Sequence, residues 1–174
     1  MNAPIARLAL VACVAAAASC GAPDRFDGRV VHGDQTSFRV GPVPSAWRRI
    51  QIEGALLAFE DTQSGGSIDV FARCGRRDDD VPLTSHLQHL LIGFTDRDTK
   101  SQATLTLDGR EALHTIVDAK LDGVPRSLAV YILKKDNCVY ELIYAASPDQ
   151  LAAGLDGFDA FSRGFQTIGA GLAR

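Results

Sequence analysis

The chain has 174 residues, 46% of them hydrophobic, and its 18 basic and 21 acidic side chains leave a formal charge of −3 at pH 7. This length suits one domain with a real core, but not two comfortable ones. Charges of both signs are mixed along the chain, so we expect no nucleic-acid partner, which would require a basic face.

The first residues have the pattern of an exported protein. Arg7 precedes an apolar run from Leu8 to Ala18, which is too short to remain as a membrane-spanning helix and has the build of a secretory signal. Small residues directly precede Cys20, as in the lipobox of bacterial lipoproteins. We therefore expect residues 1–19 to be a lipoprotein signal peptide and Cys20 to be lipidated.

Three alternatives to lipidation at Cys20 stay open. Cys13 follows Leu10-Val11-Ala12, which matches the lipobox better at its first position but leaves too short an apolar region. Ordinary cleavage near Ala16 or Ala18 would leave Cys20 as a plain thiol, and an uncleaved start would keep the chain in the cytoplasm. Gly21 stands where enterobacterial lipoproteins retained at the inner membrane carry Asp, which favours the outer membrane facing the periplasm.

The remaining cysteines, Cys74 and Cys138, lie at the ends of two strand-like runs, Ser67–Arg73 and Val139–Tyr144. An even pair in an exported chain predicts a disulfide. The alternative is two unpaired, partly buried thiols.

The chain then divides into three parts. We expect residues 20–35 to form the lipidated cysteine and a tether, with room for a short strand at 29–32. Residues 36–168 are expected to form the domain, and residues 169–174 a frayed tail. Short apolar runs predict the first strands of the domain, at 37–40, 47–52, 56–61 and 68–72.

A helix is predicted over Leu83–Phe94, because its leucines and Phe94 recur at helical spacing. Its start is open between Pro82 and a capping box formed by Ser85 and Gln88.

Three hairpin signals follow, at Asp108-Gly109, Asp122-Gly123 and Asp136-Asn137, each between apolar runs. They predict a meander of four antiparallel strands, at 103–107, 112–121, 127–133 and 139–145.

A last helix is predicted from a cap at Ser147, with Pro148 and Gln150 in its first turn. Its apolar side chains share one face, and its glycines would allow the helix to lie close on the sheet. These face residues are Leu151, Leu155, Phe158, Phe161 and Phe165, and the glycines are Gly154, Gly157 and Gly164.

The order of elements predicts an α+β fold, with an antiparallel sheet of about six or seven strands sandwiched between two helices. Several motifs in this order resemble the PsbP/Mog1-like superfamily, including DcrB-type bacterial lipoproteins. They are Phe38-Arg39-Val40 leading through Pro44 to Trp47, then Asp108–Ala112 and Asp122–Pro125, and finally Tyr140–Ala145 running through Ser147-Pro148 into the helix that ends at Phe165. The resemblance implies a shared scaffold without a common active site, so no functional residue carries over.

Metal and cofactor signals are weak. His86 and His89 are one helical turn apart, with Asp78, Asp79 and Asp80 just upstream, and are the best metal candidates. No HExxH or EF-hand pattern is present, so we expect neither a metal site nor a cofactor.

Other candidate residues point to structure. His114 lies inside a predicted strand, and no nucleophile elbow exists. Four aromatic residues fit either the core or a binding groove: Trp47, Tyr131, Tyr140 and Tyr144.

These observations predict a non-enzymatic envelope lipoprotein that serves as an accessory or binding module for a membrane-associated protein complex. The contact surface to test first is the mixed-charge loop that carries Arg76 and Arg77. The alternative is a periplasmic module that binds a metal or a small molecule.

Overall fold

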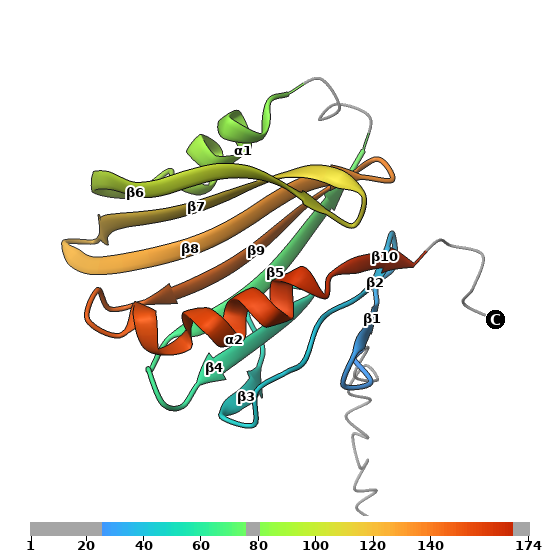
Figure 1. The fold of residues 1–174 in the computed structure, drawn as a ribbon, viewed down its shortest axis with the longest axis horizontal. Coiled ribbons are helices and arrows are strands. Elements are labelled where there is room, and N and C mark those ends of the chain that lie inside the picture. The colour runs from blue at the N-terminus through green and yellow to red at the C-terminus, as the bar shows by residue number, and fades with distance from the viewer. Residues whose placement is uncertain (1–25, 76–80, 169–174) are drawn as a thin grey trace, which may run out of the picture.

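Seven antiparallel strands form the main sheet of the computed structural model, which describes residues 26–75 and 81–168 (Figure 1). From one edge to the other they are β3 (Trp47–Ile50), β4 (Leu57–Asp61), β5 (Ser67–Cys74), β9 (Cys138–Ala146), β8 (Val124–Lys135), β7 (Arg110–Leu121) and β6 (Phe94–Leu107). The long strands β6 to β9 follow one another as the predicted meander.

Each predicted hairpin turn is present. Both residues of the turns at 108–109, 122–123 and 136–137 have positive φ, between 49° and 79°. This is the backbone of the tight turns that match strand twist, and Asp, Asn and Gly tolerate it. The turn residues therefore set the register of the four longest strands.

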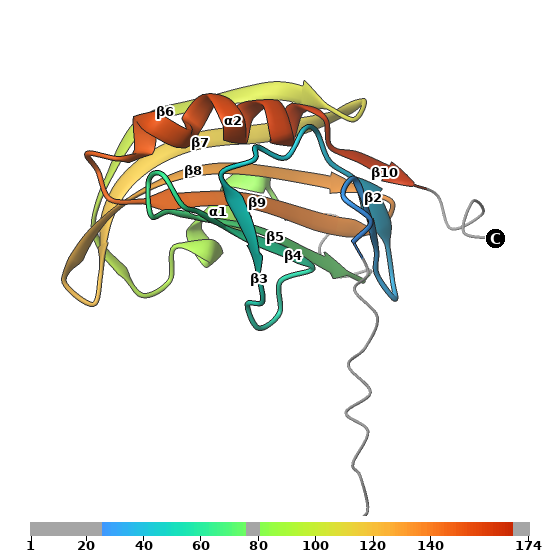
Figure 2. The same cartoon turned by 90° about the horizontal axis from the view of Figure 1, so that it is seen from below.

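The two helices cover opposite faces of the sheet, as predicted, and each closes its own hydrophobic core (Figures 1 and 2). α1 (Leu83–Leu90) places Leu87 against one face, chiefly over β7 and β8. α2 (Leu151–Arg163) places Phe158 and Phe161 in the larger core on the other face.

Glycines let α2 lie close to its neighbours. A Cβ on Gly154 would come within 2.3 Å of the Tyr144 hydroxyl, and one on Gly164 within 2.3 Å of the Gly41 Cα. No side chain fits at such distances. Glycine lowers the helix propensity at these positions, but it allows the backbone to pack closely against Tyr144 and Gly41.

Both helices are shorter than predicted. α2 begins at Leu151, after a turn in which the Ser147 carbonyl accepts hydrogen bonds from the Gln150 and Leu151 amides, and no side chain caps it. The expected capping box is therefore wrong. α1 starts after Pro82, one of the two predicted starts, and ends before Gly93, whose φ of 91° breaks the helical path.

Phe94 consequently opens β6 and does not end α1. β6 runs for 14 residues, whereas only 103–107 was predicted. Most of the strand is exposed and polar and has two irregularities in its pairing with β7. An exposed edge strand with charges and bulges lacks the alternation by which a half-buried strand is recognised.

A second sheet of three short strands adjoins the main sheet where α2 ends, in the order β1 (Val30–His32), β2 (Ser37–Arg39) and β10 (Gln166–Ile168). β2 is the central strand, so segments from both ends of the described chain pair with it. Val31 and Phe38 are fully buried in the larger core. Residues 26–35 thus pack on the fold, and the tether expected at 20–35 is wrong for this part.

Candidate functional site

The candidate site is the end of the main sheet where β5 stops and β9 starts, which we call the disulfide end. It includes the turns 108–109 and 136–137, Cys74, Cys138 and the adjoining small sheet (Figure 1). Segments distant in sequence are joined here by a disulfide and by polar contacts of Tyr140 and Asp108.

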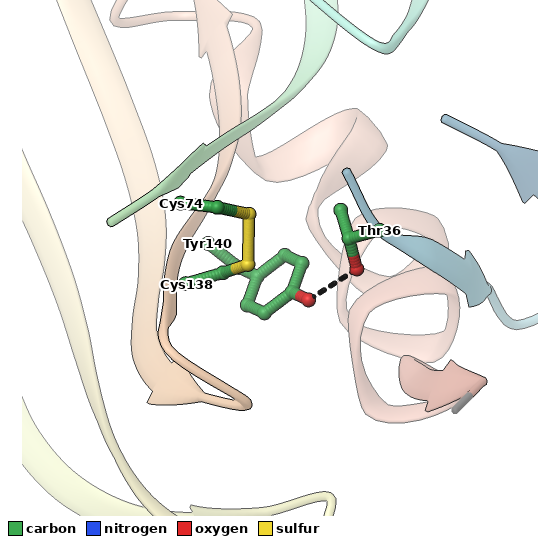
Figure 3. Close-up of a disulfide and its surroundings, with 4 residues drawn as sticks. All are labelled: Thr36, Cys74, Cys138 and Tyr140. Atoms are coloured by element: carbon green, nitrogen blue, oxygen red, sulfur yellow. Dashed lines mark hydrogen bonds between the residues drawn. A yellow bond between two sulfur atoms is a disulfide. The ribbon is translucent and has the colours of Figure 1, made fainter. Parts of the chain in front are cut away.

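Cys74 and Cys138 are paired directly across β5 and β9 and form the predicted disulfide (Figure 3). The S–S distance is 1.98 Å, and the Cα atoms are 4.0 Å apart, which is closer than the about 4.5 Å of non-hydrogen-bonded pairs in an antiparallel ladder. Cys138 is buried, whereas Cys74 is partly exposed. Next to the bridge, the Gly75 amide donates to the Asn137 carbonyl, so the bond sits at the last paired position.

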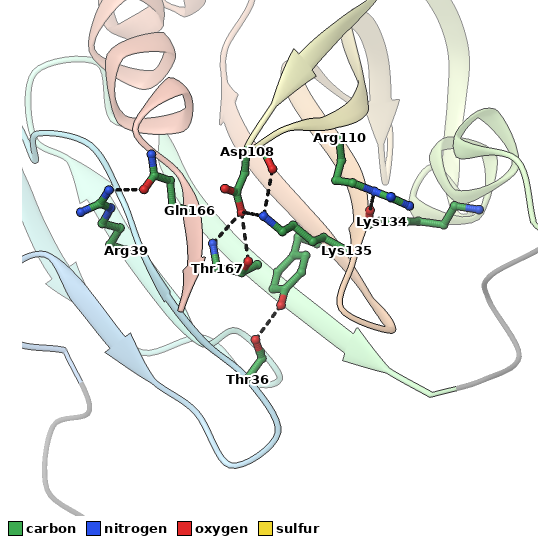
Figure 4. A network of polar contacts seen from close by, with 9 residues as sticks. Thr36, Arg39, Asp108, Arg110, Lys134, Lys135, Gln166 and Thr167 are labelled. Atoms are coloured by element: carbon green, nitrogen blue, oxygen red, sulfur yellow. Dashed lines mark hydrogen bonds and ion pairs between the residues drawn. The ribbon is translucent and has the colours of Figure 1, made fainter. Parts of the chain in front are cut away.

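Tyr140 ties the small sheet to the main one. Its hydroxyl lies 2.6 Å from Thr36 Oγ1, at the tip of the β1–β2 hairpin (Figures 3 and 4). Its ring is fully buried and packs against Phe38 and Phe165. Burial raises the pKa of Tyr140, which keeps the hydroxyl neutral at ordinary pH.

Asp108 makes the second tie (Figure 4). Its Oδ2 accepts hydrogen bonds from the backbone amide and the hydroxyl of Thr167 in β10, and forms a 2.8 Å ion pair with Lys135. Burial alone would raise the pKa of Asp108, but Lys135 and the Thr167 donors outweigh burial and lower it. Asp108 also has φ 49°, so one residue shapes the β6–β7 turn and anchors β10.

Two hollows adjoin these ties. One, of about 240 Å³, is lined by the β1–β2 turn residues 33–36 together with Leu56, Ala72 and Cys74. The other, of about 370 Å³, is lined by Leu83, the turn residues 109–111 and Lys134. Arg110 and Lys134 bring positive charge to the second hollow, and Glu111 brings negative charge.

The loop with the predicted contact residues leaves and re-enters the fold at this end. Arg76 and Arg77, like Asp78, Asp79 and Asp80, lie outside the described residues. Its two flanks are held: Gly75 bonds to Asn137, and the Val81 carbonyl accepts a 2.8 Å hydrogen bond from Lys134 Nζ. The loop was predicted from its mixed charges, but the contacts of Asp108, Lys134 and Lys135 were not, because a turn aspartate and two strand lysines carry no distinctive pattern.

The histidines have separate environments. His86 is buried on α1 and His89 is exposed, so the two do not share a surface. Within residues 26–75 and 81–168, no three His, Cys, Asp or Glu side chains are grouped so as to hold a metal ion. His114 stacks on Tyr131 with ring centroids 4.3 Å apart, and burial lowers its pKa.

The four aromatic residues are core residues. Trp47, Tyr131, Tyr140 and Tyr144 are at most 8% exposed and belong to the larger core. The Tyr131 hydroxyl donates to Asp159 on α2, and burial together with that carboxylate raises the pKa of Tyr131 to about 12. The groove considered from the sequence does not form from these residues.

Cys20 and Cys13 lie outside the described residues. Neither helix in the described part of the chain has the length and apolarity that a membrane crossing requires.

No family model and no curated protein sequence matches the chain. Solved structures do. LpqN, involved in cell envelope biogenesis of Mycobacterium tuberculosis, is 19% identical with a TM-score of 0.59, over 80% of this chain and 89% of that one. Cyanobacterial PsbP (CyanoP) from Synechocystis sp. PCC 6803 is 12% identical with a TM-score of 0.56, over 86% and 98%.

The Ran-binding protein Mog1p of Saccharomyces cerevisiae is 11% identical with a TM-score of 0.55, over 78% of this chain and 91% of that one. These similarities are at the level of the fold, and they agree with the order of strands and helices described above. The chain therefore has the PsbP/Mog1-like fold.

Proposed function

We propose that this protein is a non-enzymatic accessory lipoprotein of the bacterial cell envelope, anchored through Cys20, that binds a protein partner with its disulfide end. The observation that carries the proposal is the convergence of a disulfide, two polar ties and two hollows at one end of the sheet. Such an end holds its shape, and rigid surfaces lose little conformational entropy on binding.

The chemistry of this end suits recognition better than catalysis. Several of its titratable groups are engaged in structural contacts: Asp108 with Lys135 and Thr167, Tyr140 with Thr36, and both cysteines with each other. Neither hollow is lined by a histidine. General acid–base catalysis would instead need groups of matched pKa converging on one cleft.

The short sequence distance between Cys20 and the described fold also supports a role at a membrane. The described fold begins at Phe26, only six residues after Cys20, and Phe26 bridges to Val31 in the small sheet. A lipid on Cys20 would therefore hold the disulfide end near the bilayer, where tethering raises the effective concentration of a partner at the same surface. Among proteins of this fold, LpqN is described as involved in cell envelope biogenesis and Mog1p as Ran-binding.

The test is crosslinking in the native cell envelope followed by identification of captured proteins. We expect one envelope protein to be captured by the parent and lost when Arg76→Glu, Arg77→Glu and Arg110→Glu are combined. The matched control reverses Lys100, which is exposed on β6, and Lys120, which is partly exposed on β7, both away from the disulfide end. Equal capture by the two charge-reversed variants contradicts the proposed surface.

A further inference from the structure

A third hollow lies on the α1 side of the sheet, at the end opposite the disulfide, and has a volume of about 300 Å³. Strand-borne side chains on its wall come from four neighbouring strands, since Ile50, Glu60, Ser67 and Ala145 belong to β3, β4, β5 and β9. Arg126 of β8 and Ser147 complete its polar lining. α1 packs over β7 and β8, so this part of the face is not covered by it.

One rim of the hollow is built by a tightly bonded turn. Asp61 accepts hydrogen bonds from the Gln63 amide and the Ser64 hydroxyl, and Ser64 in turn accepts one from the buried Tyr144 hydroxyl. A Cβ on Gly66 would come within 2.8 Å of the Ala145 carbonyl, so the backbone lies directly on β9 at this point. The rim is therefore set before any ligand arrives.

Ser67, which lines the hollow, is hydrogen-bonded to a buried carboxylate, that of Asp69. Asp69 is only 9% exposed, and its Oδ1 has no hydrogen-bond partner among the described residues. Its cross-strand neighbours are Ala58 and Ile143, neither of which can compensate a charge. Burial raises the pKa of Asp69. A buried acceptor without a protein partner is costly, and in native proteins such a group has a specific explanation, such as a bound water, local strain or a role in function.

Ser67 connects this carboxylate to the hollow. Its hydroxyl donates a 3.0 Å hydrogen bond to Asp69 Oδ2. Because the single hydroxyl proton is used in that bond, the oxygen lone pairs of Ser67 remain to accept a hydrogen bond from a donor in the hollow. An ionised Asp69 places a negative charge next to this hydroxyl and favours a cationic donor, while Glu60 is already paired with Arg48.

Arg126 supplies the opposite charge on the same wall. Its guanidinium gives one hydrogen bond to the Pro125 carbonyl, and the side chain is exposed, which leaves further donors for a ligand. The lining therefore offers two different groups to a ligand: the Ser67 hydroxyl, an acceptor bonded to the Asp69 carboxylate, and the guanidinium of Arg126.

We propose that this hollow binds a small zwitterion of the amino-acid type, with its ammonium group on Ser67 and its acid group on Arg126. Asp69 acts as a positioning residue, which orients the Ser67 hydroxyl and supplies the charge behind it. The volume suits a small molecule and not a protein segment. This role is separate from the partner-binding surface at the disulfide end.

The test is an amide NMR titration of the full folded chain with three probes of equal length: 4-aminobutyrate, butylamine and butyrate. Concentrations run to about 20 mM, because a fragment with few polar contacts binds in the millimolar range. We expect saturating shifts at Gly66, Ser67 and Ala145 with 4-aminobutyrate, weaker ones with butylamine and none with butyrate.

Variants separate the two contacts. Asp69→Asn keeps the acceptor for Ser67 but removes the charge, and should weaken 4-aminobutyrate and butylamine at least tenfold. Arg126→Gln should weaken 4-aminobutyrate to the level of butylamine and leave butylamine unchanged. Asp122→Asn, in an exposed turn at the same end, is the matched control and should bind like the parent.

Three results overturn the proposal: equal shifts with butyrate and butylamine, unchanged binding in a folded Asp69→Asn variant, or no saturating shift at these amides with 4-aminobutyrate. If Asp69→Asn fails to fold, Ser67→Ala replaces it, with the same expected loss of amine binding. Since crosslinking at the disulfide end does not involve this hollow, failure here leaves the partner-binding proposal standing.

Discussion

Removing the disulfide should destabilise the fold by a calculable amount. The bond joins residues that are 64 positions apart, and closing a loop of that length in the unfolded chain is worth about 4 kcal/mol on the chain-entropy model. A domain of this size has a total stability of about 5–15 kcal/mol. The loss is therefore a large share of the whole, but β5 and β9 stay paired at eight positions, so the chain should still fold.

The assay is equilibrium urea unfolding in a Cys20→Ala background, comparing the oxidised parent with Cys74→Ala/Cys138→Ala. The midpoint should fall, and the dependence on urea should steepen, because an unlinked unfolded chain exposes more surface. The parent reduced with dithiothreitol is the control, since it keeps both side chains. A difference below about 1 kcal/mol with an unchanged slope would refute the reasoning, because it would mean that the bond hardly restricts the unfolded state.

Three further predictions concern single residues. Asp108→Asn should cost about 1.5–3 kcal/mol near pH 7, because charge-assisted hydrogen bonds are lost. Since the folded-state pKa of Asp108 lies below 3.8, the stability that its charge contributes is present above pH 4 and disappears as the pH falls through the folded pKa. Thermal unfolding of the parent and of Asp108→Asn at a series of pH values should therefore show a stability difference that shrinks as the pH falls. Gly154→Ala should lower the unfolding midpoint, at a cost of about 1–3 kcal/mol, because the added Cβ meets the Tyr144 hydroxyl. Helix propensity alone predicts a gain in stability, so a raised midpoint would contradict the packing argument. Cys20→Ala should move the protein from the detergent phase to the aqueous phase in Triton X-114 separation, and unchanged partition would exclude lipidation at that residue.

The parts of the fold that could be predicted are those where one local signal dominates. Asp-Gly and Asp-Asn pairs between apolar runs tolerate the positive φ that tight hairpin turns need, so the three hairpins were identified with their residues. The polar half of β6 could not be, because an edge strand gains its order from pairing with β7 and not from burial of its own side chains. The start of α2 shifted because Ser147 uses its carbonyl, and not its side chain, to begin the helix.

The candidate sites were less predictable than the fold. The disulfide followed from two cysteines at strand ends. Asp108 was identified only as a turn residue, and its bond to Thr167 depends on the small sheet, which no local pattern indicates. Asp69 lies in an ordinary strand sequence, and its burial results from neighbours on β4 and β9 that the sequence does not place.

The three-stranded sheet has a mechanical consequence. The chain enters the described fold through β1 and leaves it through β10, and both strands border β2. A lipid anchor would transmit a pulling force through the N-terminal segment, and that force acts on β1 before the other strands. The three paired positions between β1 and β2 can then separate one after another. β2 would stay held by β10, and the covalent bond between β5 and β9 lies beyond the point of loading. The domain can thus yield at β1, next to its attachment, while β2, β10 and the Cys74–Cys138 bond stay in place.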